Sequence, residues 1–109
     1  MIEVPNIAVD TVRDYASMLL DVREQEEWDA GHAPEAIHIP LSELAERYVE
    51  LNGDEEILVI CRSGGRSAKA ADFLLRQGHA AINVAGGMLA WQAAEMEMVS
   101  ELGTLPSVS

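Results

Sequence analysis

The sequence contains a single cysteine, Cys61, among its 109 residues. One thiol cannot close an intramolecular disulfide, so nothing in the composition requires an oxidising compartment. The thiol is therefore a packed core residue, a stray reactive group or a working nucleophile. The residues that surround Cys61 in the sequence distinguish between these three interpretations.

Cations are also scarce. Seven Lys and Arg residues stand against 19 Asp and Glu residues, which gives a formal net charge of −12 at pH 7. Nucleic acids and anionic membrane surfaces are bound through cationic groups. The composition therefore argues against both as partners.

Long apolar runs are missing as well. The uninterrupted apolar stretches are much shorter than the ~18 residues that a transmembrane helix needs. The first residues show no basic start followed by an apolar stretch of signal-peptide length. We therefore expect a cytoplasmic protein with no membrane partner.

What is present is the composition of a globular domain. Apolar residues make up 49% of the chain and charged residues 24%, which is typical of folded soluble proteins. A chain of 109 residues fits one domain. We expect a single, monomeric domain over residues 1–103, followed by a flexible tail at 104–109.

Glycines, prolines and polar clusters divide the chain into alternating strand-like and helix-like segments. Short strands are predicted at residues 2–4, 18–22, 37–39, 57–60 and 81–84. Helices are predicted at residues 11–17, from Ser42 until Gly53 stops the helix, at 68–76, and from Met88 to about Leu102. Four consecutive apolar residues at 57–60 indicate a central strand buried on both faces. The alternation predicts an α/β fold with a central, mostly parallel sheet of about five strands and helices on both faces.

A polar loop follows the predicted central strand. Cys61 comes directly after that strand, and the next six residues are Arg62, Ser63, Gly64, Gly65, Arg66 and Ser67. Ligands of open α/β sheets bind beyond the carboxyl ends of the strands. The start of the following helix offers unpaired N–H groups, and glycines let the loop curl so that these groups point inward. Such surroundings lower the pKa of a cysteine thiol and favour the thiolate, which indicates a nucleophile.

The cations cluster around this cysteine. Four of the seven lie within fifteen positions that contain one acid, Asp72, and these four are Arg62, Arg66, Lys69 and Arg76. Between Asp21 and Glu56, by contrast, twelve acids stand against Arg23 and Arg47. We expect the site to bind a small anion.

Three segments resemble the motifs of rhodanese domains. Residues 20–24 (LDVRE), with Glu27-Trp28 and residues 31–40 (GHAPEAIHIP), resemble their amino-terminal motif. Residues 61–67 resemble their active-site loop, and residues 86–91 (GGMLAW) their late GG-x-x-x-W element. The motifs run in the expected order from about residue 2 to residue 92. The resemblance implies a rhodanese-like fold and a sulfurtransferase that works through a persulfide on Cys61.

The loop length separates two activities within this fold. Cys61 to Arg66 are six residues, the length that the resemblance associates with sulfurtransferases. Related phosphatases have a loop one residue longer, and tyrosine phosphatases place Arg six positions after Cys, where this chain has Ser67. A phosphatase is therefore disfavoured.

The chemistry follows as a hypothesis. The Cys61 thiolate attacks the outer sulfur of thiosulfate or a similar donor, and cyanide or a thiol then takes that sulfur. The predicted substrate-binding residues are Arg62, Ser63, Gly64, Gly65, Arg66 and Ser67, and either arginine could hold the anionic end of the donor. We expect no metal and no organic cofactor. The alternative is a persulfide carrier or regulatory relay that acts on a protein partner, with little free thiosulfate turnover.

Two further residues, Asp21 and Arg23, are candidate supporting residues because the strand that precedes them should end near the loop. They either support the loop or its anion, or form a surface ion pair.

Other polar and aromatic side chains are assigned structural roles. We interpret His32 as part of a structural turn, and it forms no convincing metal pair with His38. The acids at residues 24, 26, 27 and 29 are expected on a solvated face, and Trp28 and Trp91 in packing. Residues 92–102 are predicted to extend the last helix, with an apolar stripe that packs on its own sheet or, alternatively, on a second copy.

Overall fold

The computed structural model, which describes residues 3–15 and 17–109, is built on a five-stranded sheet. Its strands are β1 (Asn6–Ile7), β2 (Met18–Asp21), β3 (Ile37–His38), β4 (Ile57–Ile60) and β5 (Ala81–Val84). They lie in the order β1-β5-β4-β2-β3, and every neighbouring pair is parallel. The predicted parallel sheet is confirmed.

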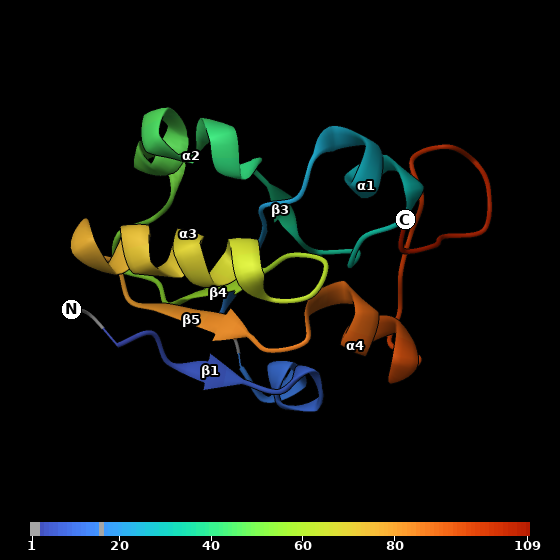
Figure 1. Ribbon diagram of the computed structural model, residues 1–109, viewed down its shortest axis with the longest axis horizontal. Helices are drawn as coiled ribbons and strands as arrows, with labels where there is room; N and C mark the ends of the chain where they lie inside the picture. The colour runs from blue at the N-terminus through green and yellow to red at the C-terminus, as the bar shows by residue number, and fades with distance from the viewer. Residues whose placement is uncertain (1–2, 16) are drawn as a thin grey trace.

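Helices cover both faces of the sheet, as the alternating pattern predicted. They are η1 (Val9–Asp14), α1 (Gln25–Ala30), α2 (Leu41–Arg47), η2 (Tyr48–Glu50), α3 (Gly65–Arg76) and α4 (Gly87–Ala93), where η marks a 3₁₀ helix. The helices α2 and α3 lie over one face, whereas η1 and α4 lie over the other (Figure 1). The α/β architecture with two helical layers is therefore confirmed.

The central strand β4 is buried along its whole length, as four consecutive apolar residues predict. Because side chains alternate along a strand, β4 contributes to an apolar cluster on each face. Val59 and Cys61 pack in one cluster with Leu74 of α3, whereas Leu58 and Ile60 belong to the other. The sulfur of Cys61 is thus held by the same packing that holds the sheet together.

The register of the sheet brings three chain segments to one edge. Asp21 pairs with Ile60, and the Val22 N–H donates to the Ile60 carbonyl at 3.0 Å. On the other side of β4, Val59 pairs with Asn83. Since the carboxyl ends of parallel strands meet at the same edge, the residues that follow β2, β4 and β5 converge there.

Several predicted boundaries are wrong near the amino end. The first strand lies at β1, after the predicted residues 3–4; residue 2 is outside the described residues. The first helix, η1, is a 3₁₀ helix that begins and ends earlier than the predicted residues 11–17, of which residue 16 is outside the described residues. The short helix α1 was not predicted, because its start is capped by a reciprocal pair of glutamates, Glu24 and Glu27, rather than by a more common capping residue.

The last helix ends much earlier than the predicted extension over residues 92–102. After Ala93 the chain turns, with Glu95 at a left-handed φ of 56°. The Met96 N–H donates to the Trp91 carbonyl at 3.2 Å, and the Trp91 indole N–H donates to the Glu97 carbonyl at 3.0 Å. The turn buries Met96 in the apolar cluster that contains Trp91, which favours the reversal over a longer helix.

The chain beyond this turn returns to α1. Val99 forms an isolated antiparallel bridge with His32, and the Glu101 N–H donates to the Asp29 carbonyl at 2.9 Å. The Ser107 N–H donates to the Ala30 carbonyl at 2.9 Å, so the segment drawn in red in Figure 1 lies beside α1. The flexibility of residues 104–109 and the monomeric state stay predictions. Within the part of the chain that is described, no helix has the length and apolar character to cross a membrane.

Candidate active site

The junction between β4 and α3 forms a tight loop around Cys61. The loop turns at Gly64, which caps α3 with a left-handed φ of 117°, a conformation that favours glycine. This turn places the Gly64 N–H 3.1 Å from the Cys61 Sγ atom. The helix therefore begins with its free N–H groups beside the sulfur.

The Cys61 thiol is buried and surrounded by hydrogen-bond donors. Its residue is 1% exposed, and the Ser67 Oγ atom lies 3.2 Å from Sγ. Burial by itself raises the pKa of the Cys61 thiol, but hydrogen bonds from the Ser67 hydroxyl and from the backbone N–H groups of Ser67, Gly64 and Ser63 hold that pKa below its ordinary value. The loop thus favours an anionic sulfur at this position.

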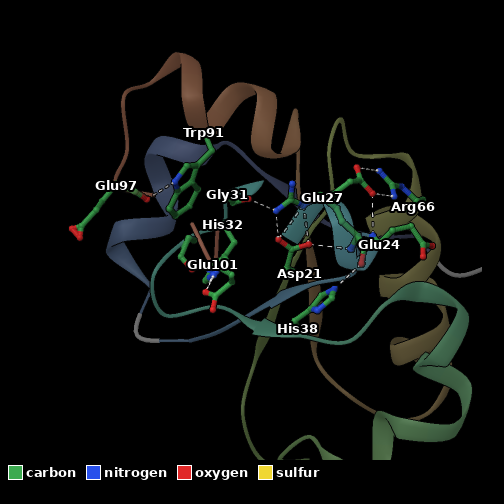
Figure 2. A network of polar contacts seen from close by, with 12 residues as sticks. Asp21, Glu24, Glu27, Gly31, His32, His38, Arg66, Trp91, Glu97 and Glu101 are labelled. Carbon is green, nitrogen blue, oxygen red and sulfur yellow. Dashed lines mark hydrogen bonds and ion pairs between the residues drawn. The ribbon is translucent and has the colours of Figure 1, made fainter. Parts of the chain in front are cut away.

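Arg66, in contrast, is already paired. Its guanidinium donates two hydrogen bonds to the Glu27 carboxylate of α1, at 2.6 and 2.9 Å (Figure 2). The Glu27 side chain is only 16% exposed, so its predicted position on a solvated face is wrong. The hydrogen bond from Arg66 holds the pKa of Glu27 below its usual range against the opposing effect of burial. Residues 39 positions apart in the chain gave no sequence signal for this pair.

Two of the other cations near the loop, Arg62 and Arg76, also have hydrogen-bond partners within the chain. The Arg62 Nε atom donates to the Ser109 carbonyl at 3.0 Å. Arg76 pairs with Asp72 at 3.0 Å, one turn away on α3. Lys69 is exposed. Hydrogen bonds rather than cations are therefore the main causes that lower the pKa of the Cys61 thiol.

Asp21 and Arg23 form a buried ion pair, so the interpretation as a surface pair is wrong. Both side chains are 0% exposed, and Arg23 Nη2 lies 2.8 Å from Asp21 Oδ2. The same Nη2 donates to the Gly31 carbonyl at 2.8 Å, just after α1. Within residues 3–15 and 17–109, Arg23 Nη1 has no hydrogen-bond partner. The pair fixes the end of β2 against α1, the helix that carries Glu27.

The glycine pair at the start of α4 holds the other side of the loop. Gly86 and Gly87 have left-handed φ angles of 81° and 56°. The N–H groups of Met88 and Leu89 donate to the carbonyls of Cys61 and Arg62, at 2.8 and 3.0 Å. A Cβ atom on Gly87 would collide with these two carbonyls. The sequence indicated a turn here, and the structure shows that this turn anchors the loop.

Two histidines near α1, His32 and His38, pack against the Trp28 ring. The His32 ring stacks on Trp28 with ring centroids 3.5 Å apart, and its Nε2 atom lies 2.7 Å from the Glu101 carboxylate. His38 stacks on Trp28 as well, and its Nε2 atom contacts the Arg23 carbonyl at 2.7 Å. Among the described residues, no group of three or more His, Cys, Asp and Glu is placed to hold a metal ion.

A separate pocket of about 550 Å³ opens between η1, the start of β2 and the turn after α4. Its lining includes Arg13, Tyr15, Pro34 and Trp91, and no residue of the loop 61–67 borders it. The pocket is therefore separate from the loop that holds Cys61.

Comparison with known proteins gives consistent matches. A family model described as "Rhodanese-like domain" matches residues 5–94. The chain is 45% identical to "Putative sulfurtransferase YtwF" of Bacillus subtilis, over 68% of this chain and 72% of that protein. It is 42% identical to "Putative sulfur carrier protein YrkF" of the same organism, over 81% of this chain but about half (51%) of that protein. A solved rhodanese-related protein from Thermoplasma volcanium is 34% identical with a TM-score of 0.80, and the match covers 87% of this chain and 97% of that one.

The anchoring role of Gly87 predicts a specific loss of stability. We expect Gly87→Ala to lower the free energy of unfolding by about 1–3 kcal/mol, because of strain at a positive φ and the collision with the loop carbonyls. Urea unfolding measures this change. Gly53→Ala is the matched control, since a Cβ atom there meets nothing. Equal unfolding free energies for the two variants would contradict the anchoring role.

The buried ion pair predicts a second, larger loss. We expect Asp21→Asn to lower the free energy of unfolding by about 3–5 kcal/mol, because the buried Arg23 charge loses its counter-charge. Glu43→Gln breaks an exposed pair with Arg47, and we expect it to lower the free energy of unfolding far less, because water screens exposed charges. Chemical denaturation measures the free energy of unfolding of both variants. Similar losses would show that burial does not increase the contribution of the Asp21–Arg23 pair to stability.

Proposed function

This chain belongs to the rhodanese-like domain family, and from that premise we propose that it transfers a sulfane sulfur through a persulfide on Cys61. The donor is thiosulfate or a similar sulfane compound, and the acceptor is cyanide or a thiol. The observation that carries the proposal is the buried Cys61 sulfur held by N–H and O–H donors of the loop. The name of the curated sulfurtransferase relative agrees with sulfur transfer.

The first step loads the cysteine. The Cys61 thiolate attacks the outer sulfur of thiosulfate and forms a new bond between Sγ and that sulfur. The S–S bond of the donor breaks, and sulfite leaves with the bonding electron pair. The step needs no separate general base, because the loop already lowers the pKa of the thiol.

The second step returns the enzyme to its starting state. Cyanide attacks the outer sulfur of the persulfide, thiocyanate leaves, and the Cys61 thiolate is restored. Between the steps, the negative charge of the persulfide lies among the N–H groups at the start of α3, which stabilise it as an oxyanion hole stabilises oxygen. A thiol acceptor takes the same sulfur and releases its proton to water.

A second candidate function is a persulfide carrier that exchanges sulfur with a protein partner. Two observations favour it. Glu27 neutralises Arg66, which weakens the attraction of the site for a free dianion, and one relative is named as a sulfur carrier. Steady-state turnover of thiosulfate with cyanide, compared with transfer from a persulfidated protein donor, separates the two functions.

Persulfide formation is the primary test. Incubation with thiosulfate, followed by intact mass spectrometry, is expected to show a gain of one sulfur that cyanide removes. Cys61→Ser should abolish the gain, and no other thiol exists in the chain to replace it. An unchanged mass in the wild type, or a gain that survives Cys61→Ser, would rule out the proposed mechanism.

The Glu27–Arg66 pair predicts how the site discriminates charge. We expect Glu27→Gln to lower the KM for thiosulfate roughly threefold and to increase its salt dependence, because Arg66 becomes free to attract the dianion. Glu26→Gln is the matched control: it removes the same charge from an exposed position of α1. If the two variants have the same KM, the pair does not set the affinity for anions.

A further inference from the structure

A chain of polar groups connects the Cys61 sulfur with the edge of the sheet. Ser67 Oγ lies 3.2 Å from Cys61 Sγ and 2.5 Å from Asn83 Oδ1. Asn83 Nδ2 donates to Asn6 Oδ1 at 2.7 Å, and Asn6 Nδ2 donates to the Val4 carbonyl at 3.1 Å. Ser67 and Asn83 are buried, at 0% and 5% exposure, whereas Asn6 is exposed. The chain therefore leads from a buried thiol to solvent.

The Ser67 hydroxyl cannot serve both of its neighbours at once. A hydroxyl carries a single proton, yet a Cys61 thiolate and the Asn83 Oδ1 atom both need it as a donor. When the proton points to Asn83, the Ser67 oxygen presents lone pairs to the sulfur. That arrangement accepts a hydrogen bond from a protonated thiol and offers nothing to a thiolate.

The two asparagines allow the opposite arrangement. A half-turn of a carboxamide exchanges its oxygen and its NH₂ group in place. After such a turn, Asn83 donates to the Ser67 oxygen, and the Ser67 proton points to the sulfur. A matching turn of Asn6 donates to the Asn83 oxygen. Every contact except that to the Val4 carbonyl is kept with its direction reversed.

We propose that Asn83 and Asn6 are positioning residues whose amides turn together and decide whether the Ser67 hydroxyl donates to a thiolate or accepts from a thiol. The thiol proton itself is released to water, and no proton passes along the chain. The inference rests on the proposed function, in which the Cys61 thiolate is the nucleophile. It assigns the edge strand β1 a part in the ionisation of the buried sulfur.

Charged groups on the surrounding elements act on the same sulfur and are held constant in the test. Asp21 and Arg23 lie at the end of β2, Glu27 lies on α1, Arg62 lies in the loop, and Arg66 and Lys69 lie in the first turns of α3. The neighbouring elements β5 and α4 carry no charged side chain. The two asparagines are thus uncharged groups, and their effect on the ionisation of the Cys61 thiol can be tested while these charged residues are left unchanged.

The test replaces Asn6 with an acceptor that cannot donate. In Asn6→Asp, the carboxylate holds the Asn83 NH₂ group toward residue 6, so the Ser67 hydroxyl keeps donating to the Asn83 Oδ1 atom. We expect Cys61 to react roughly tenfold more slowly with iodoacetamide at a pH below the thiol pKa, and its thiolate titration to move to higher pH. Pro5→Asp is the matched control, because it adds the same charge at an exposed neighbouring residue. It should react about as the wild type does.

A double-mutant cycle completes the test. In a Ser67→Ala background the link to the sulfur is gone, so Asn6→Asp should no longer change the alkylation rate. The proposal is overturned if Asn6→Asp reacts like Pro5→Asp, or if its effect persists without the Ser67 hydroxyl. Mass spectrometry of the same proteins after thiosulfate treatment keeps the two proposals apart. If the wild type forms the persulfide but Asn6→Asp alkylates normally, only the proposed role of Asn83 and Asn6 is overturned. If the wild type forms no persulfide, the proposed function is overturned.

Discussion

Hydrogen bonds to a buried sulfur are the interaction on which the rest of the site depends. Burial of Cys61 between β4 and α3 opposes ionisation of its thiol, and the loop reverses this effect with N–H and O–H donors. Those donors reach the sulfur only because Gly64 turns the backbone and α3 begins at Gly65. On the opposite side, N–H groups at the start of α4 donate to the carbonyls of Cys61 and Arg62 and so hold the loop in place. The environment of the Cys61 sulfur therefore follows from the way one central strand passes into one helix.

Ion pairs around the loop hold its neighbouring elements together. The Asp21–Arg23 pair is buried and joins β2 to the segment after α1. The helix α1 in turn presents Glu27 to Arg66 (Figure 2). Because Arg66 is paired with Glu27, the groups that lower the pKa of the Cys61 thiol are the backbone N–H groups of the loop and the Ser67 hydroxyl. This arrangement explains how a strongly acidic chain can hold an anionic sulfur without a strongly cationic site.

The sequence predicted the sheet and the loop better than the connections between them. A run of four apolar residues identifies β4. The change from these apolar residues to Cys61 and the glycines identifies the site, since both signals are local. The pairing of Glu27 with Arg66 and the burial of Arg23 depend on segments that meet only in the folded chain. The early end of α4 depends on Met96 packing beside Trp91, which helical composition alone does not reveal.

The hydrogen bonds of the loop are expected to hold the Cys61 sulfur as a thiolate in spite of its burial. The most direct measurement is a pH titration of thiolate ultraviolet absorbance in the native protein, with Cys61→Ser as the blank; the chain has no other cysteine. Because these hydrogen bonds favour the thiolate, we expect a titration midpoint clearly below the ~8.5 of an unperturbed thiol. A midpoint at or above that value would show that burial prevails over the hydrogen bonds and that the loop does not favour the thiolate.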